Sequence, residues 1–171
     1  MSKPSTQAHD WYRNVTKRVY VETTIPSYLA AWPSRDLLQA ARQQITHDWW
    51  NNERETYELC VSEIVLDEAA AGDSDAAQRR LAFLADLPLL DVTDAVNDVA
   101  KAIMESGLLP QRATRDAIHI AVSSVHGIDI LLTWNCRHIA NAAIMKELGN
   151  IVARCGYEIP IICTPEELQG D

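Results

Sequence analysis

The 171-residue sequence has few of the features that mark fibrous, secreted or membrane proteins. It contains only 6 glycines and 7 prolines, too few for a collagen-like or low-complexity chain. No apolar run comes near the roughly 18 residues of a membrane span, and no secretory signal follows the first residues. The four cysteines, Cys60, Cys136, Cys155 and Cys163, form no CxxC pair, so we expect reduced, mostly buried thiols. These absences favour a globular, cytoplasmic protein with no membrane partner.

Basic residues are also scarce. The sequence has 15 Lys and Arg against 24 Asp and Glu, which gives a net charge of −9. Such a charge argues against tight nonspecific binding to DNA or anionic membranes. It does not exclude a nuclease, because clustered carboxylates that hold a divalent metal carry local negative charge until the metal binds.

Sequence motifs of several common enzyme classes are missing as well. The chain has neither GxGxxG nor GxxxxGK[ST], so dinucleotide and P-loop nucleotide chemistry have no support. It also lacks HExxH and GxSxG, and its five histidines form no metal-ligand pattern. Zinc-protease and serine-hydrolase functions are therefore excluded.

The sequence does contain a regular alternation of short apolar runs and helix-length patterns. Strands are predicted at residues 18–22, 59–61, 88–92, 128–134 and 160–163. Helices are predicted at 34–54, 63–72, 74–86, 93–107, 112–126 and 139–155, with a further helix start at 164. Ser34, Ser62 and Thr93 are the expected N-caps. This alternation predicts one α/β domain over residues 18–171, with a central parallel sheet flanked by helices, after a polar N-terminal tail at 1–17.

Acidic and amide side chains follow the predicted strands, where ligands bind in open parallel sheets. Glu22 ends the first strand, and Asn135 follows the strand at 128–134. Each helical residue turns by about 100°, which directs Glu68 of helix 63–72 toward the apolar face. Glu63 and Asp67 of the same helix point away from it. We therefore expect Glu68, rather than its acidic neighbours, to face Glu22.

A further acid, Asp116, lies at the rim of the apolar face of helix 112–126, with Arg112 and His119 one step further out. Four oxygen-bearing groups on separate elements would converge at the carboxyl ends of the strands and suit Mg²⁺ or Mn²⁺. Two such ions roughly 3.5–4 Å apart can activate a water and stabilise the leaving oxygen of a phosphodiester. Without metal, repulsion should raise the pKa of at least one acid or drive the side chains apart.

Four stretches carry these groups in order: VETTIPSY with Glu22, VSEIVLDE with Glu68, RDAIHIA with Asp116 and LLTWNCRHIAN with Asn135. This ordered set, within about residues 18–165, resembles the PIN-domain family and, within it, the VapC-like toxins of type II toxin–antitoxin systems. The resemblance implies a three-layer fold, Mg²⁺ or Mn²⁺ bound by acids, and endoribonuclease activity on RNA. It also implies a homodimer and, for toxins, a neutralising antitoxin protein.

The resemblance carries over to individual residues. Glu22, Glu68 and Asp116 match three family acids and are the implied metal ligands, while Asn135 completes the implied catalytic set. Glu22 stands where the family usually has Asp, which extends its carboxylate by roughly 1.5 Å. Asn135 stands where many members have a fourth acid, so the site has one negative charge fewer but keeps a carbonyl oxygen as a ligand. Thr133 matches a threonine at the family's strand end.

Two other functions compete with a nuclease. The departures at Glu22 and Asn135 would also suit a PIN-like binding module that has lost catalysis. A receiver-like signalling domain is disfavoured, because Glu22 stands alone and the first lysine after Trp134 is Lys146, within a predicted helix.

Several flanking side chains have two interpretations each. The basic residues beside the site could contact RNA phosphates or be ordinary surface charges: Arg112, Arg115, Arg137 and His138. Trp134 is interpreted as a wall of the site. A homodimer is predicted from an apolar stripe on helix 34–54 and from the nearby tryptophans: Leu38, Ala41, Ile45, Trp49, Trp32 and Trp50.

Overall fold

The computed structural model describes residues 16–169, so most of the predicted tail at 1–17 lies outside the described residues. Within them, parallel strands form one sheet in the order β3-β2-β1-β4-β5. The strands are β1 (Arg18–Val21), β2 (Glu58–Ser62), β3 (Leu89–Leu90), β4 (Ile130–Leu132) and β5 (Ile161–Cys163). The predicted parallel α/β sheet is confirmed, although four of the predicted strands are shorter in the structure and β2 is one residue longer at each end.

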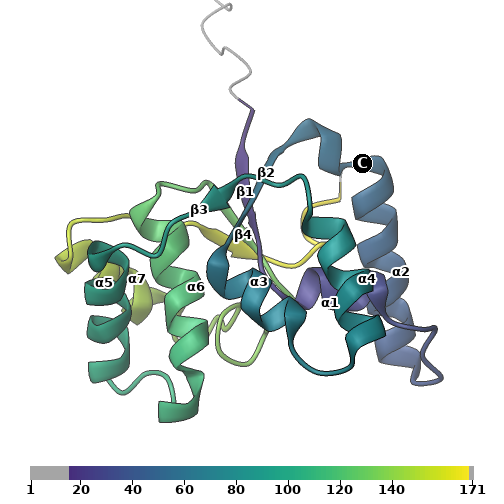
Figure 1. Ribbon diagram of the computed structural model, residues 1–171. Coiled ribbons are helices and arrows are strands. Elements are labelled where there is room, and N and C mark those ends of the chain that lie inside the picture. The colour runs from purple at the N-terminus through teal and green to yellow at the C-terminus, as the bar shows by residue number, and fades with distance from the viewer. Residues whose placement is uncertain (1–15, 170–171) are drawn as a thin grey trace, which may run out of the picture.

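Helices cover the sheet on both sides and complete three layers. They are α1 (Thr24–Ala30), α2 (Leu37–Asn52), α3 (Glu63–Ala70), α4 (Ser74–Leu84), α5 (Asp94–Glu105), α6 (Thr114–Val125) and α7 (Met145–Arg154), with short 3-10 turns η1 (Arg54–Thr56) and η2 (Gln111–Ala113). Figure 1 shows α5, α6 and α7 grouped on one side of the sheet and α1, α2 and α4 on the other. None of the helices in residues 16–169 has the length and apolar character needed to cross a bilayer.

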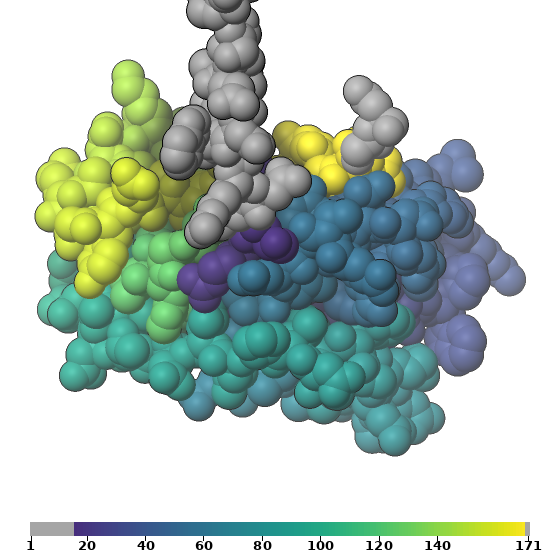
Figure 2. Space-filling view, turned by 90° about the horizontal axis from the view of Figure 1, so that it is seen from above, coloured from purple at the N-terminus to yellow at the C-terminus, as the bar shows by residue number. Residues whose placement is uncertain are grey.

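The central strands are apolar because both of their faces are covered. Val19, Tyr20 and Val21 of β1 are fully buried, as is the β4 segment beside them. Figure 2 looks down on the amino-terminal ends of the strands, where the start of β1 (purple) lies between blue and green segments, in agreement with the strand order. At the opposite edge, the backbone N–H of Glu22 donates to the carbonyl of Leu132 at 3.1 Å, which places Glu22 beside the end of β4.

Helix α1 was not predicted from the sequence. It begins two residues after Glu22 and contains Pro26 at its third position, where the missing N–H has no intrahelical partner to lose. The next helix, α2, begins later than predicted, since Asp36 rather than Ser34 is its N-cap and accepts a hydrogen bond from the Gln39 backbone. The Ser34 hydroxyl instead accepts from the Asp36 backbone N–H.

Three other expectations about helix ends are wrong. Ser62 precedes α3 but makes no side-chain cap, because its hydroxyl bonds to Tyr20 in the core. The helix predicted from 139 begins only at Met145, since the chain first closes turns in which two backbone N–H groups donate to the Asn135 carbonyl. The start predicted at Thr164 remains a turn, in which Glu167 accepts from the Thr164 backbone and hydroxyl.

The apolar stripe predicted on α2 is correct in its second half only. Trp49 is fully buried and Ile45 packs against the core, whereas Leu38 is 62% exposed and Ala41 is exposed. The other buried residues of α2 are Gln43, Thr46 and Trp50. Large apolar side chains are instead exposed around the start of this helix: Trp32 at 75%, Leu37 at 88% and Leu38.

The four cysteines are free thiols. Burial raises the pKa of the Cys60 and Cys163 thiols to about 11, so both stay protonated at neutral pH. Cys136 is exposed, in contrast to the expected burial.

Candidate functional site

The Glu22 carboxylate lies at the carboxyl end of β1 and is almost fully buried, at 4% exposure. Its Oε2 accepts three hydrogen bonds: from the Thr24 backbone at 3.1 Å, the Thr24 hydroxyl at 2.5 Å and the Thr133 hydroxyl at 2.7 Å. Its Oε1 accepts no hydrogen bond from residues 16–169. One oxygen is therefore fixed by the protein, and the other is left available to a ligand.

Glu68 extends toward Glu22 from α3, the helix that follows the neighbouring strand β2. Its Oε2 accepts from the Thr23 hydroxyl and lies 3.0 Å from His119 Nε2. Its Oε1 has a looser contact, at 3.7 Å from the guanidinium of Arg115, whose side chain is 56% exposed. Glu63 and Asp67, on the same helix, are exposed, as the helical periodicity indicates.

The surroundings of Glu68 keep it ionised. Burial alone would raise the pKa of this carboxyl, but the His119 hydrogen bond and charge, the Thr23 hydrogen bond and the Arg115 charge together outweigh burial. The pKa of Glu68 therefore lies below its ordinary value. For Glu68 this is the opposite of the rise expected from repulsion among the acids, because hydrogen-bond donors as well as acids surround it.

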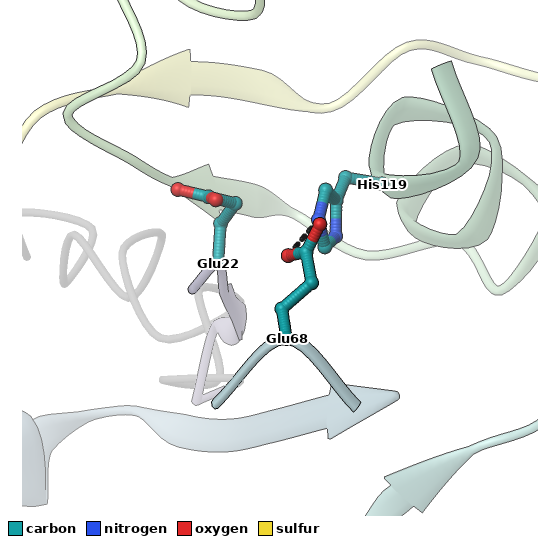
Figure 3. Close-up of side chains that lie close together, drawn as sticks. All are labelled: Glu22, Glu68 and His119. Atoms are coloured by element: carbon teal, nitrogen blue, oxygen red, sulfur yellow. Dashed lines mark hydrogen bonds and ion pairs between the residues drawn. The ribbon is translucent and has the colours of Figure 1, made fainter. Parts of the chain in front are cut away.

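His119 is the residue of this site that sequence reasoning missed. Its ring is 1% exposed, and its Nδ1 lies 2.8 Å from the hydroxyl of Tyr20. Ligand atoms of Glu22, Glu68 and His119 all lie within 4.8 Å of one another, and Figure 3 shows these three side chains converging from β1, α3 and α6. The arrangement can hold a divalent cation.

Asp116 and Asn135, also predicted for the site, form a second cluster. The Asn135 carbonyl oxygen accepts from the His138 backbone at 3.1 Å, so its amide nitrogen faces Asp116 and donates to Oδ1 at 3.0 Å. His138 Nδ1 lies 2.7 Å from the other oxygen of Asp116. Both oxygens of Asp116 are thus occupied, and Asp116 lies outside the close group that Glu22 and Glu68 form with His119.

Two threonines connect the two clusters. The Thr133 hydroxyl donates to Glu22 and accepts from the Asn135 backbone at 2.9 Å. In the same way, the Thr24 hydroxyl donates to Glu22 and accepts from the Trp134 backbone at 2.8 Å. Glu22, Asn135 and Asp116 therefore belong to one hydrogen-bonded network at the carboxyl ends of β1 and β4, and Glu68 lies close to Glu22 beside it.

Trp134 borders this network as a buried wall rather than an exposed stacking surface. Its indole N–H donates to the Thr46 hydroxyl on α2 at 2.8 Å, and the ring of Tyr28 meets it edge-on at 6.0 Å. The guanidinium of Arg42 lies 5.1 Å from the ring centroid. Trp134 therefore joins the site to helices α1 and α2.

The donor set fits a hard divalent cation. Glu22 and Glu68 each present one oxygen that no hydrogen bond from residues 16–169 occupies, and each holds its other oxygen with fixed donors. Carboxylate oxygens with oriented second oxygens are the ligands that Mg²⁺ and Mn²⁺ prefer. The assignment of these residues as metal ligands remains a prediction.

The sequence and the fold are similar to those of known proteins. The family model of the PIN domain matches residues 19–144. Solved structures that share the fold include the two described next, both of which are less than 20% identical to this chain. One is VapBC2 from Rickettsia felis bound to a promoter DNA fragment, with a TM-score of 0.55, 15% identity and coverage of 86% of this chain and 98% of that chain. The other is VapC20 from Mycobacterium tuberculosis, a toxin that cleaves the sarcin–ricin loop, with a TM-score of 0.57, 18% identity and coverage of 72% and 95%. No curated protein sequence matches the chain.

Proposed function

The chain belongs to the PIN-domain family, and from this membership we propose that it is an endoribonuclease that depends on Mg²⁺ or Mn²⁺. The observation that carries the proposal is the pairing of Glu22 and Glu68. The Glu22 carboxylate at the end of β1 and the Glu68 carboxylate on α3 each have one oxygen that accepts no hydrogen bond from residues 16–169, and ligand atoms of the two residues lie within 4.8 Å of each other. Two ionised carboxylates this close together repel each other, and a bound cation would relieve that repulsion.

Each residue of the network has a role in this proposal. Glu22 and Glu68 hold the ion, while Thr24 and Thr133 orient Glu22. Asp116 serves as the third ligand when it gives up one of its two hydrogen bonds. A bound divalent ion supplies Lewis acidity and lowers the pKa of a water that attacks the phosphodiester.

The neighbours of Asp116 act on the substrate side of the site. Asn135 holds Asp116 and stands where a fourth acid would add charge. The partly exposed Arg115 and His138 contact the RNA phosphates, which would otherwise be repelled by an acidic site.

We further propose that the protein is the toxin of a toxin–antitoxin pair. The support is its sequence resemblance to VapC-like toxins and its fold likeness to VapC20, a toxin that cleaves the sarcin–ricin loop. The proposal names an RNA substrate, an antitoxin protein as partner and a cytoplasmic site of action. A short neighbouring open reading frame encoding a DNA-binding protein would support it.

A twofold homodimer is part of the same proposal. Its support is the exposed apolar group at the start of α2: Trp32, Leu37 and Leu38. Sedimentation at micromolar concentration should show a species of twice the 19.1 kDa chain mass. A 19.1 kDa species alone would contradict the dimer.

The direct test of the proposed function is incubation of the purified protein with a panel of structured and unstructured RNAs. Cleavage is expected with Mn²⁺ or Mg²⁺ and should stop when a chelator removes the metal. A metal-induced rise in Tm with no cleavage of any RNA would instead favour the binding-module alternative. The engagement of both Asp116 oxygens by Asn135 and His138 is the observation that favours that alternative.

A further inference from the structure

A chain of hydrogen bonds runs from the core of the protein to the candidate metal site. It links Ser62 Oγ to the Tyr20 hydroxyl at 2.6 Å, Tyr20 to His119 Nδ1 at 2.8 Å, and His119 Nε2 to Glu68 Oε2 at 3.0 Å. We propose that His119 is a positioning residue, whose Nε2–H holds Glu68 for metal binding and whose ring is held in place by the Tyr20 hydroxyl at Nδ1. This inference rests on the proposed metal-dependent function.

The direction of each bond follows from the chemistry of its partners. An ionised carboxylate only accepts, so His119 must donate from Nε2 to Glu68. We take the His119 ring as neutral, so that its other nitrogen accepts and the Tyr20 hydroxyl is the donor to Nδ1. The Tyr20 oxygen can in turn accept from the hydroxyl of Ser62. In a doubly protonated ring both nitrogens would donate, and the Tyr20 oxygen would accept from Nδ1.

Burial keeps these hydrogen bonds between the same partners. Tyr20 and Ser62 are fully buried, and His119 is 1% exposed, so water does not compete for their hydrogen bonds. If the buried Tyr20 hydroxyl donated no hydrogen bond, water could not accept from it, and the protein would be less stable. The His119 ring is thus anchored from within the sheet, through a strand residue two positions before Glu22.

The same contacts favour a positioning role for His119 over direct coordination of the metal ion. His119 lies close enough to Glu22 and Glu68 to be counted among the ligands of one ion. To ligate through Nε2, however, it would have to release Glu68 and carry its proton on Nδ1, facing the Tyr20 hydroxyl. As a positioning residue it instead occupies Oε2 of Glu68 together with Thr23, so that Oε1, whose one contact is the exposed guanidinium of Arg115 at 3.7 Å, is the oxygen that a metal would take.

The first experiment reads the tautomer in the metal-free protein by nitrogen-15 NMR of the His119 ring. We expect a protonated Nε2 and an unprotonated Nδ1 in the wild type. Tyr20→Phe removes the donor to Nδ1 while Glu68 still accepts from Nε2, so the ring should keep its Nε2 proton and the Nδ1 resonance should shift toward that of a nitrogen without a hydrogen bond. A wild-type ring protonated on Nδ1, or an Nδ1 resonance unchanged in Tyr20→Phe, would overturn the inference without any measurement of RNA cleavage.

The second experiment measures Mn²⁺ binding by calorimetry for three proteins below their melting temperatures. His119→Leu keeps a similar volume without a donor and should weaken Mn²⁺ binding by about 10- to 100-fold. His119→Gln places an amide N–H near the position of Nε2 and should bind Mn²⁺ nearly as the wild type does. Ser124→Ala, on the same helix and bonded only to the Ile120 carbonyl, is the control for stability loss and should leave Mn²⁺ binding unchanged.

The outcomes distinguish this inference from the proposed function. Unchanged Mn²⁺ binding in His119→Leu would overturn the positioning role, and so would His119→Gln binding as weakly as His119→Leu, which would indicate direct coordination or packing. A wild type that binds Mn²⁺ but cleaves no RNA would contradict the nuclease proposal only. The positioning role of His119 would still be decided by Mn²⁺ binding to His119→Leu and His119→Gln. A wild type that binds no Mn²⁺ would overturn both.

Discussion

The amide of Asn135 donates to Asp116 Oδ1 at 3.0 Å, at the position where the family resemblance implies a fourth carboxylate. The orientation of the amide is fixed by the His138 backbone, which donates to its carbonyl oxygen. The Asn135 amide therefore stabilises the negative charge of Asp116 without a metal ion. An aspartate at position 135 would instead repel Asp116 unless a cation lay between the two carboxylates.

Asn135→Asp should make the protein more dependent on metal. Two carboxylates about 4 Å apart repel by roughly 4 kcal/mol at an effective dielectric of 20, so the metal-free variant should melt at a lower Tm than the wild type. A divalent cation should then raise its Tm by more than it raises that of the wild type. Differential scanning fluorimetry with and without Mn²⁺ measures both effects.

Asn150→Asp provides the matched control, since Asn150 is exposed on α7. It should leave the metal-induced change in Tm as in the wild type. Equal metal responses in Asn135→Asp and Asn150→Asp would show that position 135 does not contribute to metal binding.

The lowered pKa of Glu68 predicts a loss of stability in acid. Between the ordinary pKa of the unfolded chain and the lower pKa of the folded protein, the unfolded state binds more protons. The free energy of unfolding should therefore decrease as the pH falls through this interval, and the stabilisation from Glu68 should be present above it. Urea unfolding from pH 6 down to about pH 3 should show a shallower decrease in Glu68→Gln than in the wild type.

Glu63→Gln, which changes an exposed carboxylate on the same helix, should follow the wild-type pH dependence. The prediction fails if Glu68→Gln and the wild type lose stability in parallel.

The sheet could be predicted from the sequence because its strands are short apolar runs separated by helices. The ends of elements were less predictable, since they depend on which polar side chain takes a given backbone donor. Asp36 rather than Ser34 caps α2, and Ser62 turns into the core to bond with Tyr20 instead of capping α3. Helix α1 was not predicted, because its seven residues are too few to show a helical period and one of them, Pro26, is typical of turns.

Helical periodicity placed Glu68 correctly relative to Glu63 and Asp67, because α3 has one exposed face. The same reasoning failed for His119, since α6 is buried almost all around and has no single apolar face to orient it. A buried histidine in such a helix needs polar partners, and these come from Tyr20 and Glu68 on distant segments. No local sequence pattern encodes that contact.

Arg115 is expected to contribute to RNA binding rather than to stability. Its side chain is 56% exposed and its contact with Glu68 is 3.7 Å long, so Arg115→Ala should change the free energy of unfolding by less than about 1 kcal/mol. Loss of a phosphate contact should raise KM for RNA and reduce the salt dependence of binding. Arg154→Ala, at an exposed position on α7 with no ion pair among the described residues, is the control. Equal KM values in Arg115→Ala and the wild type would contradict this role.

Thr46 is expected to support the wall of the site. Its hydroxyl accepts the buried indole N–H of Trp134, so Thr46→Val leaves a buried donor without a partner. The variant should lose about 1–3 kcal/mol of unfolding free energy, measured by urea denaturation. Thr56→Val, at an exposed position, should have little effect. A Thr46→Val protein as stable as the wild type would show that another acceptor replaces Thr46.

The most direct test of the metal-dependent nuclease is the rate of RNA cleavage with Mn²⁺ by the wild type, Glu68→Gln and Glu63→Gln, measured side by side. Glu68→Gln removes the charge of a proposed ligand and misplaces the ion, so its rate should fall by about 100-fold or more. Glu63→Gln, on the exposed face of the same helix, should cleave RNA as fast as the wild type, and a chelator should stop both. Cleavage that survives in Glu68→Gln, or that continues in the presence of the chelator, would contradict the account.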